Sequence, residues 1–132
     1  MTAKNLLLCV GMMAVGFLGS EVLHAQQGIK RTLLQRSEVP GSNYEAVLGI
    51  AEIPPGGTSG RHTHPGFELG YLMEGELLVL VDGAGERHFK AGDSWRVEDG
   101  KPHEARAVGD QPAKVMAVYV VEKGKPIATP AP

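Results

Sequence analysis

The sequence is almost without cysteine: Cys9 is the only one among 132 residues. It lies within an N-terminal segment, residues 1–25, that we expect to be removed. A mature chain would then contain no disulfide, no thiolate metal ligand and no cysteine nucleophile. The sequence also lacks a basic cluster, and its net charge is −2. A nucleic acid partner is therefore not expected.

Helical patterns are also missing, since no convincing ten-residue helix follows residue 25. Apolar residues make up 42% of the chain and charged residues 21%, as in a soluble globular protein. The 18 glycines and 9 prolines fall mostly between short apolar runs. Many turns between short strands are typical of an all-β fold. The length suits a single domain.

The expected strands number about eight, with turn signals every 8 to 12 residues, which predicts a β-sandwich or β-barrel. A closed barrel removes exposed sheet edges, an advantage in a domain of this size. We place the barrel at residues 44–121. Residues 26–43 form an N-terminal segment that drapes over the domain or pairs at an edge, and residues 122–132 form a loose Pro-rich tail. The strands are expected at residues 44–53, 58–64, 68–73, 76–81, 86–90, 94–97, 103–108 and 114–121.

Residues 1–25 have the pattern of a secretory signal peptide. Lys4 precedes an apolar or glycine stretch over residues 6–19, and Ala25 precedes a polar Gln26. Cleavage after Ala25 would leave no stable membrane span and would make the protein periplasmic or secreted. No Arg-Arg pair precedes the apolar run, which favours the general secretory route. The alternative is an uncleaved membrane anchor, but the run is shorter than the roughly 20 residues that span a bilayer.

Three of the four histidines after residue 25 have a spacing suited to a metal. His62 and His64 would project to one side of a strand, with Cα atoms roughly 7 Å apart. Glu68 follows a Pro-Gly turn, and His103 begins a later strand. Imidazoles with one carboxylate suit a divalent transition metal such as Fe, Mn, Co, Ni, Cu or Zn. The His-x-His pair by itself would rather indicate two exposed strand histidines; the longer spacing changes that interpretation.

The longer spacing resembles the two sequence motifs of the cupin family. The resemblance covers residues 46–121, with 16 residues between the motifs. Two positions depart from the second motif: Glu98 stands where proline is usual and Ala107 where asparagine is usual. Neither is a ligand position, so the departures concern the pocket mouth. The first motif consists of Gly56, His62, His64, Glu68 and Gly75, and the second of Gly92, Gly100 and His103.

The resemblance implies a jelly-roll β-barrel that holds one divalent metal through His62, His64, Glu68 and His103. It also implies an octahedral site with two positions open to water, a small-molecule substrate or O₂. From the residues alone, a closed tetrahedral structural site stays open as an alternative, because four ligands would also complete it. The metal would be Fe, Mn, Zn, Cu or Ni.

Three functions remain open: a metal-dependent dioxygenase acting on a small organic substrate, a non-catalytic module that binds or senses a small ligand, and an interaction protein with an idle metal site. The lack of an evident general base beside the ligands favours the dioxygenase, because the metal carries out the redox chemistry. Glu74 and Glu76 are acid–base candidates, but the sequence favours solvated turn residues at both positions. Trp95 reads as a core residue that could also line the pocket. His88 is expected at the surface.

The strand at residues 114–121 is apolar on both faces. One face would be buried in the barrel, and the other against a partner or the N-terminal segment. This pattern is compatible with a homodimer.

Overall fold

The computed structural model describes residues 28–132, so the expected signal peptide and Cys9 lie outside the described residues. Within this range the chain folds into strands, turns and loops without a helix. Accordingly, residues 28–132 contain no helix with the length and apolar character needed to cross a membrane.

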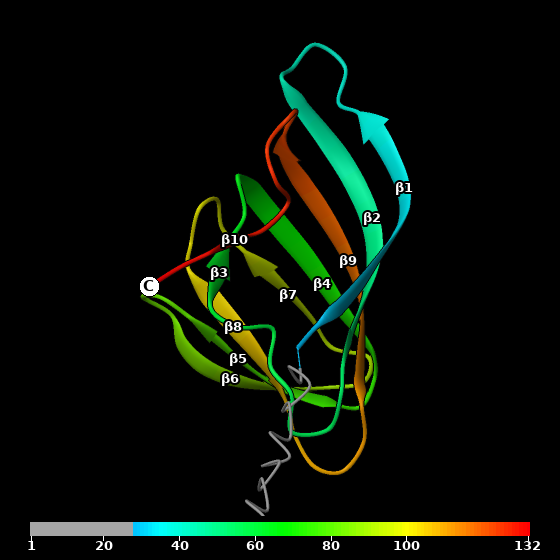
Figure 1. Cartoon of the computed structure of the whole chain (residues 1–132), viewed down its shortest axis with the longest axis vertical. Coiled ribbons are helices and arrows are strands. Elements are labelled where there is room, and N and C mark those ends of the chain that lie inside the picture. The colour runs from blue at the N-terminus through cyan, green and yellow to red at the C-terminus, as the bar shows by residue number, and fades with distance from the viewer. Residues whose placement is uncertain (1–27) are drawn as a thin grey trace, which may run out of the picture.

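Ten strands form two five-stranded antiparallel sheets that face each other (Figure 1). The first sheet has the order β1-β2-β9-β4-β7, and the second has the order β10-β3-β8-β5-β6. This is the all-β, single-domain jelly roll expected from the sequence. The strands are β1 (Lys30–Glu38), β2 (Tyr44–Ile53), β3 (His62–Thr63), β4 (Gly66–Glu74), β5 (Glu76–Val81), β6 (Gly85–Lys90), β7 (Ser94–Val97), β8 (His103–Ala107), β9 (Ala113–Glu122) and β10 (Thr129–Pro130).

The core lies between the two sheets, because the long strands turn every second side chain inward. Burial alternates without interruption along β2, and the buried residues of β9 likewise occupy alternate positions. Side chains from the second sheet complete the packing, among them Leu77 of β5 and Phe89 of β6. The largest fully buried side chains are Ile53, Leu72, Leu77, Val47, Val97 and Val121.

Gly75 connects the sheets, since it separates β4 of the first sheet from β5 of the second. Its φ of 80° lies in the left-handed region, which is accessible to glycine without strain. A Cβ at this position would lie 2.4 Å from the carbonyl oxygen of Pro112. Both the backbone conformation and the close approach therefore require glycine here.

The expected strand at residues 58–64 is shorter in the structure. Only His62 and Thr63 form β3, with an isolated bridge between Thr58 and Arg106. Gly60, with φ of 66°, bends the chain between these two pairings. The amide of Ser59 still donates to the carbonyl of Ala105 at 2.8 Å, so this segment runs beside β8.

The segments before and after the expected barrel both pair with it. Half of the N-terminal segment forms β1, which lies at the edge of the first sheet beside β2 (Figure 1). The tail, expected to be loose, is held in place: β10 pairs with β3, and Arg61 donates to the carbonyl oxygen of Pro132. Arg61 also forms a two-pronged ion pair with Asp82, at 2.8 and 2.5 Å. The Pro-rich composition of the tail does not reveal these anchors, which come from residues far away in sequence.

The outer face of the first sheet carries exposed apolar side chains. Met116 of β9 is 38% exposed, and β4 adds Leu69 at 44% and Tyr71 at 46%. The strand at residues 114–121 is thus buried on its inner face and only partly covered on its outer face.

Candidate metal centre

The structure brings together all four residues expected as metal ligands. His62 of β3 is paired in register with His103 of β8, and His64 follows β3 directly. Glu68 comes from β4 in the opposite sheet, where it faces Tyr119 of β9 in register. One potential ligand atom from each of the four lies within 4.8 Å of the others, and all four residues are buried.

Backbone carbonyls fix the orientation of the three imidazoles. The Nδ1 of His62 donates to the carbonyl of Gly60 at 2.8 Å, and that of His103 donates to Lys101 at 2.9 Å. The Nδ1 of His64 donates to Ile127 at 2.5 Å, so the C-terminal segment takes part in orienting the site. A ring that carries its proton on Nδ1 can offer the lone pair of its Nε2 to a metal. Outer hydrogen bonds of this kind are typical of metal-binding histidines.

The chemistry of this donor set fits a metal ion. Glu68 Oε2 lies 2.9 Å from His64 Nε2 and 3.4 Å from His103 Nε2. The Nε2 of His103 is buried and has no hydrogen-bond partner. Four acceptor atoms directed at one point repel each other unless a cation or a proton lies between them. Three imidazole nitrogens and a carboxylate could hold one divalent transition metal.

Electrostatics keep two of the donors, His62 and Glu68, in the state that a metal requires. Burial lowers the pKa of His62 to about 4, with further lowering from the neighbouring histidines and Arg31. Burial alone would raise the pKa of Glu68, but the adjacent His103 and His64 outweigh it and hold that pKa well below its ordinary value. Near neutral pH, His62 is therefore a neutral donor and Glu68 a carboxylate.

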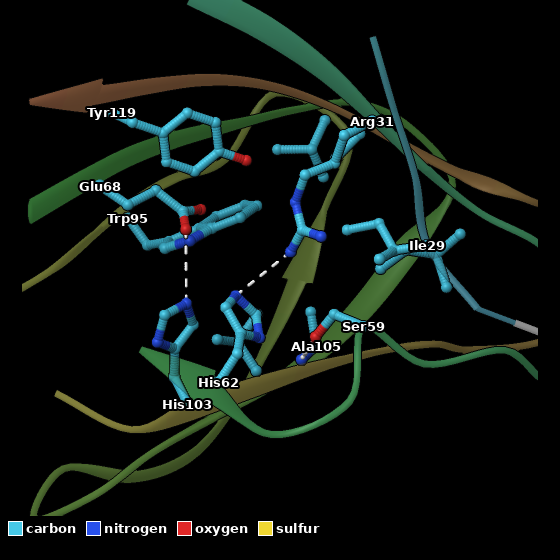
Figure 2. Close-up of a pocket in the computed structure, with 13 residues that line it drawn as sticks. Ile29, Arg31, Ser59, His62, Glu68, Trp95, His103, Ala105 and Tyr119 are labelled. Atoms are coloured by element: carbon cyan, nitrogen blue, oxygen red, sulfur yellow. Dashed lines mark hydrogen bonds and ion pairs between the residues drawn. The ribbon is translucent and has the colours of Figure 1, made fainter. Parts of the chain in front are cut away.

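A small cavity of about 30 Å³ borders three of the four residues, His62, Glu68 and His103 (Figure 2). A volume of this size exceeds the roughly 10–15 Å³ that one water requires, yet it leaves room for only a few heavy atoms. Most of the remaining wall is aliphatic or aromatic and includes Ile53 and Trp95. The lining residues are Ile29, Arg31, Ala51, Ile53, Ser59, His62, Glu68, Val79, Trp95, His103, Ala105, Val115 and Tyr119.

Sequence reasoning missed two polar residues of this cavity, Arg31 and Tyr119 (Figure 2). Burial and the nearby Glu68 carboxylate raise the pKa of the Tyr119 phenol to about 12, so it stays protonated. A tyrosine among the small inward-facing residues of residues 114–121 was a usable signal for Tyr119. Arg31 had no comparable signal, because only the pairing of β1 with β2 directs it inward.

The other candidates take different places. His88 is exposed and lies 2.8 Å from Glu76 at the surface, and Glu74 is exposed as well. Trp95 has both roles considered for it: it lines the cavity and packs against Phe89 with ring centres 5.0 Å apart. Besides Glu68, no carboxylate lines the cavity within the described part of the chain.

The comparisons agree with this geometry. Residues 49–119 match the family model of the cupin domain, and this range contains all four candidate ligands. The chain is 32% identical over 80 residues to the oxalate-binding protein of Thermotoga maritima, which covers 60% of this chain and 65% of that protein. It is also 31% identical over 78 residues to the HTH-type transcriptional regulator PuuR of Escherichia coli, covering 58% of this chain and 40% of the regulator. The chain thus spans less than two thirds of the length of either protein.

A solved structure of recombinant oxalate oxidase in complex with glycolate superimposes with a TM-score of 0.64 and 27% identity. The match covers 79% of this chain and 55% of the oxidase chain. Three findings lead to one conclusion: the two facing antiparallel sheets, the buried His₃Glu cluster and the match over more than half of the sequence. The chain belongs to the cupin family.

Proposed function

We propose that this protein is an exported cupin that binds one divalent transition metal through His62, His64, Glu68 and His103 and acts as a metal-dependent dioxygenase on a small organic substrate. The observation that carries the proposal is the cavity beside three of the four donors. A closed structural site would need no such space, whereas a reactive centre needs a free position beside the metal.

The chain's own residues supply binding and positioning. His62, His64 and His103 offer imidazole nitrogen donors, and Glu68 contributes one negative charge. When bound, the metal would supply Lewis acidity and, for a redox-active ion, the electrons that O₂ chemistry requires. Tyr119 keeps its proton and can donate a hydrogen bond into the cavity.

The aliphatic and aromatic wall limits the water near the site, which strengthens electrostatic interactions there. The lining offers no carboxylate apart from Glu68 to act as a separate general base. This composition favours chemistry carried by the metal over proton-transfer chemistry carried by a side chain.

A non-catalytic module that binds or senses a small ligand is the alternative. The similarity to an oxalate-binding protein and to a transcriptional regulator supports this second reading. Both readings share the metal and the small cavity, and they differ only in whether bound substrate is consumed.

Oxygen uptake by the metal-loaded protein distinguishes the two. The protein is reconstituted separately with Fe, Mn or Cu and screened against a panel of small acids and phenols. A dioxygenase should consume O₂ when one of these compounds is its substrate. Ligand binding by calorimetry without O₂ uptake for any metal would favour the binding module.

The metal assignment has a direct test in a matched pair of histidine variants. His103→Ala should abolish stoichiometric metal binding, because it removes a buried donor of the cluster. His88→Ala should leave metal content unchanged, because His88 is exposed and pairs with Glu76. Equal metal content in the two variants would refute the assignment.

Export rests on the pattern of residues 1–25 in the sequence. Expression of the full chain in a bacterial host should yield a periplasmic product that begins at Gln26. Recovery of an intact chain in the membrane fraction would favour the uncleaved anchor instead.

A further inference from the structure

Arg31 brings a positive charge into the cavity beside the proposed metal site. It reaches in from β1, and its guanidinium points toward His62 (Figure 2). The Nη2 atom lies 3.4 Å from His62 Nε2, the nitrogen left free for a metal. The Nε atom is buried and has no hydrogen-bond partner.

Most arginines in residues 28–132 are paired with a carboxylate, and Arg31 is not. Arg36 pairs with Glu45, Arg61 with Asp82, Arg96 with Glu98 and Arg106 with Glu104. Arg87, which also lacks such a pair, is exposed and lies over the ring of Phe89. An arginine held for structural reasons would have its charge matched, because a buried donor without a partner is destabilising.

The charges around the cavity do not balance once a metal is present. A divalent cation would contribute two positive charges and Arg31 one, against the single negative charge of Glu68. The other polar groups of the wall add no anion: Tyr119 stays protonated, and Ser59 Oγ is bonded to the backbone at Gly60 and Ala105. A cavity with this excess of positive charge favours an anionic ligand.

We propose that Arg31 is a specificity-determining residue that binds the carboxylate of a small anionic ligand. The proposal deepens the proposed function, because it names the chemical class of the molecule that occupies the cavity beside the metal. The planar fork of a guanidinium matches a carboxylate with two parallel hydrogen bonds. Of the two atoms concerned, Nε is buried without a hydrogen-bond partner and Nη2 lies 3.4 Å from His62 Nε2.

The size of the cavity narrows the class further. A volume of about 30 Å³ exceeds the roughly 10–15 Å³ that one water requires and favours small acids over long-chain acids. The apolar wall formed by Ile53, Val79 and Trp95 offers no hydrogen bond to further polar substituents. The ligand class is therefore short monocarboxylates and dicarboxylates, with glycolate and oxalate as suitable probes.

The test is calorimetric titration of the metal-loaded full chain with glycolate, oxalate and the neutral analogue glycolamide. Arg31→Met should weaken binding of glycolate and oxalate roughly 10- to 100-fold, as expected when a charged hydrogen-bond donor is lost. Arg31→Lys should give an intermediate loss, because it keeps the charge and loses the fork. Wild-type protein should bind glycolamide more weakly than glycolate by a similar factor.

Lys30→Met is the matched control. Lys30 is the neighbouring residue on β1, carries the same charge and is 77% exposed, with its ammonium near Glu52. It should bind both acids within about twofold of wild type, since exposed charges contribute little at this distance. Metal content, measured for every variant, should stay at one ion per chain.

The outcomes separate this proposal from the proposed function. Wild-type carboxylate affinity in Arg31→Met at full metal content would overturn the role of Arg31 and leave the metal site intact. Equal affinity for glycolate and glycolamide, or a preference for inorganic phosphate, would do the same. Wild-type protein that takes up no metal would refute the proposed function itself. If Arg31→Met does not fold, Arg31→Gln and the comparison of glycolate with glycolamide in wild type decide the question.

Discussion

Acidification should destabilise the metal-free protein through His62. The imidazole is buried between the sheets, and its pKa is lowered from the ordinary value of 6.5 to about 4. A depressed histidine pKa means that the unfolded chain binds a proton more readily than the folded chain. The stabilising contribution of neutral His62 is therefore fully present above pH 6.5 and is lost as the pH falls toward 4.

The two pKa values set the size of this effect. Proton linkage between pKa 6.5 and pKa 4 gives a loss of about 2 kcal/mol between pH 7 and pH 5, approaching about 3 kcal/mol at pH 4. Glu68 affects stability at lower pH than His62 does. Its folded-state pKa is also depressed, so its contribution to the free energy of unfolding is lost only as the pH falls below the ordinary glutamate pKa of 4.5. Between pH 7 and pH 5 the His62 effect is thus separable from that of Glu68.

Urea unfolding in the presence of EDTA, repeated across this pH range, measures the effect. The matched variant is His62→Gln, which places a neutral side chain at the same position and should lose about 2 kcal/mol less than wild type between pH 7 and pH 5. An identical pH dependence in the two proteins would refute the reasoning. If the variant does not fold, NMR titration of the His62 ring in metal-free wild type tests the same pKa.

Three further predictions concern the metal, the pocket wall and assembly. Elemental analysis of protein isolated from its native compartment should find Zn or Cu at least as often as Fe. The reason is that export removes cytosolic metal sorting, and sites with nitrogen and oxygen ligands bind Cu and Zn tightly; finding only Fe or Mn would contradict this. Gly70→Ala should destabilise the fold by about 1–3 kcal/mol, because a Cβ at Gly70 would lie 2.3 Å from the ring of Trp95. The substitution should also shift the fluorescence of Trp95, the sole tryptophan. Wild-type stability and emission in the variant would contradict this contact. Wild-type protein should sediment as a homodimer and Met116→Glu as a monomer, since Met116 lies on the exposed apolar face of the first sheet; a wild-type monomer would contradict this.

The parts of the site that the sequence predicted well are those fixed by short-range geometry. His62 and His64 are two residues apart and therefore share one face of an extended segment. Glu68 follows after a short turn, so the spacing of the three residues constrains their positions. The buried alternation in β2 and β9 was similarly readable, because period-two patterns report directly on a sheet with one covered face. His103 required the second motif, since its register with His62 depends on sheet pairing.

The remaining features depend on contacts between distant segments. Arg31 points into the cavity because β1 pairs with β2 and sets Arg31 opposite Ala51. The tail is ordered because Arg61 and β3 hold it, and its Ile127 carbonyl then orients His64. Composition and local pattern carry no record of either arrangement, which is why the tail was expected to be loose and Arg31 was not singled out.

These two distant contributions have a consequence for how function varies within the fold. The residues that match the family, 49–119, contain the four donors but neither Arg31 nor Ile127. The matched region therefore supplies the proposed metal site, while β1 supplies the charge beside it and the segment between β9 and β10 supplies one of its orienting carbonyls. A chain with the same four donors and an apolar residue at the position of Arg31 would offer a cavity with one positive charge fewer. Such a chain should discriminate less between anionic and neutral ligands, so this preference in proteins of this architecture would depend on the edge strand as well as on the donor motif.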